Sequence, residues 1–392
     1  MSSGTDVIVV GAGCMGAAVA AHLVRVDGAP SVKVLDSDLS LERSSTLRSD
    51  GNVRIQFNLR ENIAMSLYGM EVLDRFGDEM EVDGHRPHVE LKRQGNLFLA
   101  DADSEEEARP GLELQQDMGC DVVWLDQTQI AARWSPLVGD RIVGGTFGRD
   151  DGSVDPTAVT TGYRRVATTG GAVFEQAEVV ALEVDGDRIR GVRLASAEVL
   201  EADVVVVCAG AWSTELLATA SVEIPVAPIM RTVYVVATDV GRGMEMPSAF
   251  LPSGVYLIPE APGRYLMAWS LPDDPVGYDF TPARRDHFYG TVWPELVAWL
   301  PSFDRLEVVG SWAGLYAQNT LDANAILGEW PTVSGLYQAT GFSGHGFQHC
   351  HAVGRYLAES ITGAPPFLDL SRFGPQRVLA GHPLHELAGR II

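Results

Sequence analysis

Lysine is scarce in this sequence. Only Lys33 and Lys92 occur among 392 residues, so nearly all of the 29 basic side chains are arginines. Asp and Glu number 52, which gives a formal net charge of −23. Nucleic acids and anionic membranes attract basic surfaces, so this charge disfavours both as partners. Two lysines also leave few places for a catalytic lysine.

Cysteine pairs and long hydrophobic runs are absent as well. The four cysteines are scattered and form no C-x-x-C motif, a pattern typical of reduced, mostly buried cysteines in a cytoplasmic protein. The apolar runs are too short, or too interrupted by glycine and charge, to cross a bilayer. A strand that begins almost at once leaves no room for a signal peptide before Val7. We therefore expect a cytoplasmic protein with no integral membrane association.

The sequence does contain enough apolar residues, 46%, for a large core. Strand-like and helix-like stretches alternate, which predicts an α/β fold. Residues 6–10 form a short apolar run suited to a buried parallel strand, and a helix over 14–26 and a strand over 32–35 complete a βαβ unit. Residues 178–194 predict a hairpin, because a turn signal at 185–187 separates two strand-like runs.

The later part of the chain changes character and then returns to the first style. Residues 202–208 predict another buried strand. Between 224 and 309 the strands alternate apolar and polar residues, as expected of an antiparallel sheet with one face in water. The last hundred residues predict a strand over 336–340, a glycine-rich turn and a helix over about 348–361.

A glycine motif follows the first strand: Gly11-Ala12-Gly13-Cys14-Met15-Gly16, with Asp36 at the end of the next strand. The first glycine permits a tight turn, the second lets a pyrophosphate approach the backbone, and the third lets helix and strand pack closely. The helix N-terminus offers N–H donors to phosphate, and the Asp36 carboxylate suits a ribose hydroxyl. The motif predicts a dinucleotide site. Asp36 disfavours a 2′-phosphate, while FAD and NAD both stay open on this motif alone.

Further motifs resemble one known group, the FAD-dependent family that includes sarcosine oxidase, glycine and D-amino acid oxidases and dimethylglycine dehydrogenase. Beyond the glycine motif, the resemblance rests on Ser44-Ser45 ahead of 51–54, on 151–156 and on 202–212. The most specific blocks are WAGLYAQNTLDANAILG at 312–328 and GFSGHGF at 341–347. These blocks are especially similar to the branch that includes a mitochondrial flavoprotein implicated in complex I assembly.

The resemblance spans nearly the whole chain and implies a two-domain fold. A Rossmann-like FAD-binding domain, with a mixed or parallel sheet and helices, would comprise residues 1–85, 145–215 and 310–392. An antiparallel-sheet substrate domain would comprise 86–144 and 216–309. FAD would lie extended between them.

The resemblance also implies which residues hold FAD. Ser44 and Ser45 would bond the pyrophosphate, Val179 the adenine through its backbone, and the turn before Gln348 the flavin pyrimidine edge. A helix N-terminus there suits the negative charge of reduced flavin. The predicted cofactor-binding residues are Gly11, Gly13, Cys14, Met15, Gly16, Asp36, Ser44, Ser45, Arg48, Val179, Gly210, Trp212, Gly344, His345, Gly346, Phe347 and Gln348.

Two departures from the family predict noncovalent FAD. Where monomeric sarcosine oxidases carry a flavin-linked cysteine, this sequence has Gly314. Where dimethylglycine dehydrogenases carry a flavin-linked histidine, it has Arg48.

The candidate substrate site combines residues from several segments: Arg54, Tyr256, Trp269, Tyr316, His345 and Gln348. Arg54 matches the place of family arginines near the flavin or the substrate carboxylate, with a structural salt bridge as the alternative role and Arg48 as the alternative anchor. Tyr256 and Trp269 would wall the pocket, or else pack within the sheet. Tyr316 and His345 would line the flavin site.

Two family lysines are missing. Gln348 stands where sarcosine oxidase has a second carboxylate-binding cation, and Leu266 falls near its oxygen-activating lysine. A cation near the flavin stabilises developing superoxide, so its absence predicts slow reduction of O2 unless an arginine or histidine substitutes. His345, His349 and His351 lack carboxylate or cysteine partners at ligand spacing, and we predict no metal.

The predicted activity is oxidation of the C–N bond of a small amine or amino acid to an imine, with O2 reoxidising the flavin to give H2O2. A dehydrogenase that passes electrons to a quinone or an electron-transfer protein is the first alternative. A flavin-binding assembly protein with little turnover is the second, and a hydroxy-acid oxidase the third. We expect a monomer or homodimer.

Overall fold

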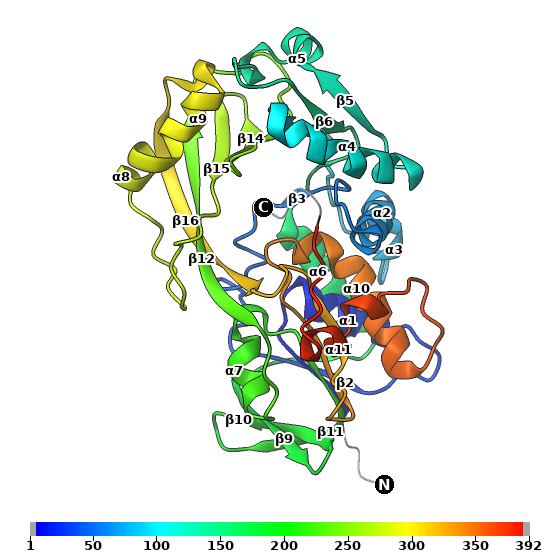
Figure 1. Ribbon diagram of the computed structural model, residues 1–392. Helices are drawn as coiled ribbons and strands as arrows, with labels where there is room; N and C mark the ends of the chain where they lie inside the picture. Colours follow the sequence, from blue (N-terminus) through cyan, green and yellow to red (C-terminus); the bar gives the residue numbers. More distant parts are fainter. Residues whose placement is uncertain (1–4, 387–392) are drawn as a thin grey trace.

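A computed structural model of the protein describes residues 5–386 and contains two large β-sheets flanked by helices (Figure 1). The first sheet has the order β17-β18-β11-β1-β2-β8, and β10 and β9 extend it from β11. Its strands are β1 (Thr5–Val10), β2 (Val32–Asp36), β8 (Val173–Gln176), β9 (Val179–Asp185), β10 (Arg188–Leu194), β11 (Val199–Val207), β17 (Ile326–Glu329) and β18 (Leu336–Thr340). The βαβ unit, the hairpin and the strand over 336–340 are confirmed.

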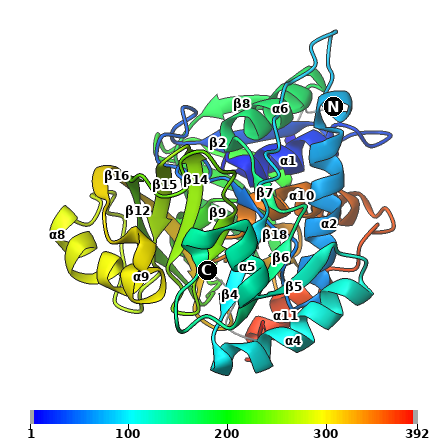
Figure 2. The same cartoon turned by 90° about the horizontal axis from the view of Figure 1, so that it is seen from above.

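The centre of this first sheet is parallel and fully buried. β1 pairs in parallel with both β11 and β2, and Ile8 and Val9 have no exposed surface. Helix α1 (Cys14–Leu23) packs against α6 (Pro156–Thr169) and α10 (Gly346–Thr362) on one face of the sheet (Figure 2). A Cβ at Gly354 would lie 2.7 Å from Cβ of Ala18, so this glycine permits the close crossing of α10 and α1. Helix α10 begins two residues earlier than the sequence predicted.

The second sheet has the order β16-β12-β15-β14-β13-β4-β6-β5. Its long strands pair antiparallel, as predicted, although β13 pairs in parallel with β4. Its strands are β4 (Asn96–Ala100), β5 (Val122–Asp126), β6 (Gly144–Gly148), β12 (Val226–Ala237), β13 (Ser248–Phe250), β14 (Tyr256–Ala261), β15 (Arg264–Ala268) and β16 (Glu307–Asn319). A small third sheet joins β3 (Asn52–Val53) to β7 (Gly152–Ser153).

The prediction that this second sheet has one face in water holds for the first half of the edge strand β16, where exposed residues alternate with buried or half-buried ones, and is wrong for the central strand β12. Neighbouring residues on β12 point to opposite faces, yet Val233 and Tyr234 are both buried. On the Tyr234 side, Leu296 and Trp299 of α9 (Trp293–Trp299) cover the sheet. On the Val233 side, the sheet covers a cavity. Tertiary packing on both faces therefore shields an alternating strand from solvent.

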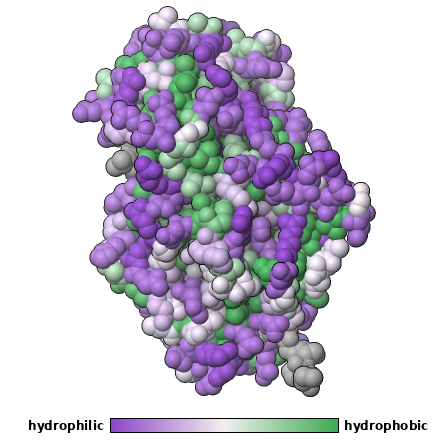
Figure 3. Space-filling model, turned by 90° about the vertical axis from the view of Figure 1, so that its right-hand side faces the viewer, coloured by the Kyte–Doolittle hydropathy of each residue, from purple (hydrophilic) through white to green (hydrophobic). Residues whose placement is uncertain are grey.

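The remaining helices lie around the two sheets: α2 (Arg60–Asp74), α3 (Phe76–Glu79), α4 (Ala102–Asp117), α5 (Gln127–Arg133), α7 (Ser213–Ala218), α8 (Arg285–His287) and α11 (Pro375–Leu379). Hydrophilic residues cover most of the face in Figure 3, and they separate its apolar side chains into small groups. Within residues 5–386, the helices are all too short or too polar to span a bilayer. The boundaries of the two domains stay a prediction.

Candidate functional site

The first glycine turn joins β1 to α1 and depends on glycine for steric reasons. Gly11 has a φ of +107°, and a Cβ there would lie 2.3 Å from the carbonyl oxygen of Cys208. A Cβ at Gly16 would lie 1.9 Å from the carbonyl oxygen of Gly11. The Asp36 carboxylate accepts hydrogen bonds from the N–H groups of Ala12 (2.7 Å) and Asp38 (3.0 Å). Asp36 thus also fixes the shape of the turn.

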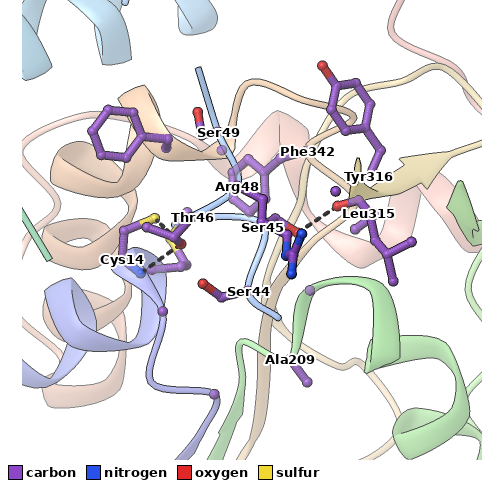
Figure 4. Close-up of a pocket in the computed structure, with 18 of the residues that line it drawn as sticks. Cys14, Ser44, Ser45, Thr46, Arg48, Ser49, Ala209, Leu315, Tyr316 and Phe342 are labelled. Carbon is purple, nitrogen blue, oxygen red and sulfur yellow. Dashed lines mark hydrogen bonds between the residues drawn. The ribbon is translucent and has the colours of Figure 1, made fainter. Parts of the chain in front are cut away.

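A loop over residues 44–49 runs past the N-terminus of α1 (Figure 4). The hydroxyl of Thr46 accepts a hydrogen bond from the N–H of Cys14 (3.2 Å). The hydroxyl of Ser45 donates to the carbonyl oxygen of Leu315 (2.6 Å), and that of Ser44 donates to Leu41 (2.8 Å). The loop therefore connects the first glycine turn to β16.

The second glycine turn precedes α10. Gly344 has a φ of +102°, and a Cβ there would lie 2.5 Å from the ring of Tyr316, so glycine lets this ring lie against the turn. His345 is buried, and neither of its ring nitrogens has a partner among the described residues. Burial and, secondarily, the charge of Arg54 lower the pKa of His345 to about 3, so the ring is neutral. The side-chain oxygen of Gln348 accepts from the backbone N–H of Arg54 (2.7 Å).

A single cavity of about 730 Å³ connects the two turns. A volume of this size lies within the usual range of about 300–1,000 Å³ for small-molecule and cofactor sites. The predicted cofactor residues at its wall are Gly11, Gly13, Cys14, Met15, Asp36, Ser44, Ser45, Arg48, Val179, Gly210, Trp212, Gly344, His345, Gly346, Phe347 and Gln348. Gly16 is not among the described lining residues. Its lack of a side chain lets α1 pack against the turn.

The two candidate anchoring arginines differ in their surroundings. The guanidinium of Arg54 lies 4.3 Å from the ring centre of Phe57, and it donates to the carbonyl oxygen of Gln56 (3.3 Å). Burial lowers the pKa of Arg54 to about 10, although Glu386 and Asp151 oppose the shift. Arg48, by contrast, donates to the backbone carbonyl oxygens of Glu42 (2.7 Å) and Ala313 (2.8 Å). Arg48 is thereby committed to holding the loop against β16.

Beyond the second turn, the cavity opens under the second sheet into a space that we call the chamber. Its wall includes Tyr256, Tyr316 and Arg54, which the sequence predicted, and Asp50 and Arg231, which it did not. Burial raises the pKa of Tyr316 to about 12, and it also raises the pKa of Tyr256 well above its ordinary value. Both phenols therefore keep their protons.

Arg231 lies at the wall of the chamber on β12. Its guanidinium forms an ion pair with Asp274, donates to the carbonyl oxygen of Leu271 (3.0 Å) and lies 5.3 Å from the ring centre of Tyr316. A cation in an otherwise apolar strand, RTVYVVA, was a signal in the sequence that could have identified it.

The structure does not bring Trp269 to the cavity, whose described lining lacks this residue. Its indole N–H donates to the carbonyl oxygen of Ser253 (2.8 Å), and the ring packs against the core on the other face of the sheet. The place of the missing oxygen-activating lysine is apolar, because Leu266 packs with Val233 and Ile258.

The features of the cavity fit FAD. Two helix N-termini, of α1 and α10, present backbone N–H groups to it at separate places. His345 lies at the cavity wall, and within the described residues neither of its buried ring nitrogens has a hydrogen-bond partner. The glycines at 11, 13, 344 and 346 let the two turns that border the cavity pack closely against neighbouring residues, since a Cβ there would contact Cys208, Thr46, Tyr316 or Phe342. Within the described residues, no cluster of three or more His, Cys, Asp or Glu is placed to hold a metal ion.

Comparison with known proteins decides the family. The DAO family of FAD-dependent oxidoreductases matches residues 6–360 of the chain. The chain belongs to this family. FAD-dependent oxidoreductase domain-containing protein 1 of Xenopus laevis is 32% identical to this DAO-family protein over 418 residues, which cover 97% of this chain and 84% of that protein.

Solved structures agree with this placement. L-proline dehydrogenase from P. horikoshii has a TM-score of 0.85 at 25% identity, covering 98% of this DAO-family protein and 100% of that chain. Glycine oxidase from Geobacillus kaustophilus has a TM-score of 0.79 at 21% identity, covering 94% and 97%, and shares the fold. This DAO-family protein is therefore an FAD-dependent oxidoreductase with the two-sheet fold that the sequence predicted.

Proposed function

We propose that this protein oxidises the C–N bond of a small amine or amino acid to an imine, which then hydrolyses. The observation that carries the proposal is the chamber, where arginine and tyrosine side chains meet next to the turn that begins α10. The relatives support it, since their names specify a proline dehydrogenase and a glycine oxidase. Bound FAD would supply the two-electron acceptor, and the protein has to orient the substrate and exclude water.

Several side chains have the chemistry that this orientation requires. Arg54, a buried cation at the chamber wall, would bind a substrate carboxylate. Tyr256 and Tyr316 would enclose the substrate as neutral phenols. His345 and Gln348, at the start of α10, would contact the flavin where negative charge develops during the reaction.

The cofactor would be bound without a covalent link. Gly314 has no reactive side chain, and a Cβ there would lie 3.1 Å from Cβ of Arg48, whose guanidinium is already bonded to backbone carbonyls. Denaturation in acid should release all of the yellow colour into the supernatant. Colour that stays in the precipitated protein would contradict this.

For the electron acceptor we propose O2, with H2O2 as the product. The cationic Arg54 near His345 has the charge that stabilises developing superoxide. The apolar surroundings of Leu266 favour a second candidate, a dehydrogenase that uses a quinone or an electron-transfer protein. Peroxide formation during turnover separates the two. A cytoplasmic location and a monomeric or homodimeric state stay predictions.

An anaerobic screen of amino acids and secondary amines tests the proposed function. A substrate should bleach the flavin absorbance of the holoenzyme without oxygen, whereas hydroxy acids should not. A holoenzyme that dithionite bleaches, but no amine does, would support the assembly-protein alternative.

A further inference from the structure

A carboxylate without a cationic partner, that of Asp50, lines the chamber. One of its oxygens accepts from the backbone N–H of Asn52 (3.0 Å), and the other accepts from the hydroxyl of Tyr256 (3.0 Å). Across residues 5–386, no arginine, lysine or histidine forms an ion pair with it. Its negative charge is therefore held by neutral donors only.

The enclosure of Asp50 makes this charge costly. Burial raises the pKa of the Asp50 carboxyl, while the hydrogen bonds from Asn52 and Tyr256 oppose the shift. A carboxylate removed from bulk water is stabilised most by a cation at hydrogen-bond distance. A ligand that brings a positive charge into the chamber would provide one.

The groups around Asp50 do not provide this charge. Tyr256 on β14 and Tyr316 on β16 are neutral phenols. Arg231 on β12 is paired with Asp274. The guanidinium of Arg48, two residues before Asp50, donates to backbone carbonyls instead. The chamber thus has a negative group at Asp50 and a separate positive group at Arg54, a distribution that complements a zwitterion.

We propose that Asp50 is a catalytic residue that binds the protonated amine of the substrate and accepts one of its N–H protons before the C–N bond is oxidised. In this step an N–H bond breaks, its electron pair stays on nitrogen and an O–H bond forms on Asp50, with no change in oxidation state. The inference rests on the proposed function, which supplies the two-electron oxidation that follows. The hydroxyl of Tyr256 keeps the accepting carboxylate in place.

The inference narrows the class of substrate. Primary and secondary alkyl amines and amino acids with a basic nitrogen carry the cation that Asp50 requires. Amides and hydroxy acids lack it. Asp50 therefore argues against the hydroxy-acid oxidase alternative.

The first test compares Asp50→Asn with Asp369→Asn. Asparagine keeps the size of Asp50 and an acceptor for the Asn52 N–H. Asp369 is a matched control. Like Asp50, it accepts a hydrogen bond from the backbone N–H two residues later (Ser371, 3.0 Å), but its side chain is exposed. The readout is the rate constant of anaerobic flavin reduction from pH 6 to pH 10, alongside the FAD content.

Asp50→Asn should reduce the flavin about 100-fold more slowly at pH 7, a typical contribution of a positioned base. Its rate should recover toward the wild-type rate as pH approaches the pKa of the free amine, about 10, because solvent then removes the proton. Asp369→Asn should follow the wild-type profile. An Asp50→Asn variant with full FAD content and an unchanged pH profile would overturn the inference.

The second test needs no turnover. Trimethylglycine carries a fixed cation, and 3,3-dimethylbutanoate has the same shape without it. Titrations of the holoenzyme, followed by the flavin spectrum, should show that the cationic probe binds at least about tenfold more tightly. This preference should vanish in Asp50→Asn. Equal binding of the two probes, or binding of neither, would overturn the inference.

The two tests separate failure of this inference from failure of the proposed function. Suppose that no amine bleaches the wild-type flavin, but the preference for the cationic probe depends on Asp50. Asp50 then binds the ammonium group as inferred, and the proposed oxidation of the C–N bond is wrong. If amines bleach the flavin and Asp50→Asn has the wild-type pH profile of flavin reduction, the proposed oxidation is supported and the catalytic role of Asp50 is wrong.

Discussion

The two ends of the cavity are built in different ways. At the end next to the first glycine turn, which we call the backbone end, glycine backbone takes part in the wall, and Gly11, Gly13 and Asp36 all come from one continuous βαβ unit. At the chamber end, side chains form the wall, and Asp50, Arg231, Tyr256 and Tyr316 come from four separate segments. A backbone site tolerates almost no substitution of its glycines, whereas a side-chain site changes its ligand when one residue changes.

The second glycine turn combines both kinds of wall. Its backbone begins α10, yet Gly344 is required because the ring of Tyr316, a side chain of the second sheet, lies against it. The turn is therefore the place where the two sheets meet at the cavity. The motif at 341–347 is therefore constrained both by the start of α10 and by the Tyr316 ring of the second sheet.

The substitution with the largest expected effect tests the backbone end. Gly16→Ala places a Cβ 1.9 Å from the carbonyl oxygen of Gly11, so the turn has to open. Bound FAD, measured by absorbance after gel filtration, should fall below about a tenth of the wild-type content. Gly290→Ala is the control, because its Cβ would meet no atom within 4 Å. Full FAD content in Gly16→Ala would show that the backbone end is more tolerant than we infer.

A substitution in the chamber should leave FAD in place and weaken the binding of carboxylated substrates. Arg54→Met should raise the KM for carboxylated amines about 10- to 100-fold, the usual range for a lost hydrogen bond to a charged group. Arg264→Met, on the exposed end of β15, is the control. Steady-state kinetics with an acid and its neutral amide analogue measure the effect. The KM of the amide should not change, and an equal rise for both would argue against Arg54 as the anchor.

The smallest effect concerns a histidine of α10 outside the cavity wall. His351 is fully buried and hydrogen-bonded to Tyr163 (2.7 Å), and burial lowers its pKa to about 3 from an ordinary value of 6.5. As pH falls below 6.5, His351 binds a proton in the unfolded chain but stays neutral in the folded protein. Stability present above pH 6.5 is thus lost toward pH 3, by at most about 1.4 kcal/mol per pH unit.

His351→Asn removes this contribution. Its free energy of unfolding in urea should therefore fall less steeply between pH 6.5 and pH 4.5 than that of the wild type. The exposed His287→Asn is the control and should keep the wild-type slope. Equal slopes for all three proteins would mean that His351 is not buried as a neutral ring.

Prediction from sequence succeeded where function follows from local geometry. The glycine at 11 and the acid at 36 are located by spacing alone, because strand, turn and helix lie next to each other in the chain. The turn at 344 is located by the family resemblance. It was wrong about a face in water at the central strand β12 of the second sheet, since alternation along a strand does not reveal what packs on the polar side. It placed Trp269 in the pocket for the same reason. It missed Asp50 and Arg231, whose partners Tyr256 and Asp274 lie 206 and 43 residues away in the chain.

The sequence by itself determined the backbone end of the cavity: a buried parallel strand, a turn that only glycine can make and a helix N-terminus at the cavity wall. Backbone geometry is local, and a short motif is enough to specify it. Only the tertiary structure decided the chamber, where a carboxylate, two phenols and two guanidinium groups meet. Asp50 and its hydrogen-bond partner Tyr256 are 206 residues apart in the chain, and no local pattern records which of these groups become neighbours.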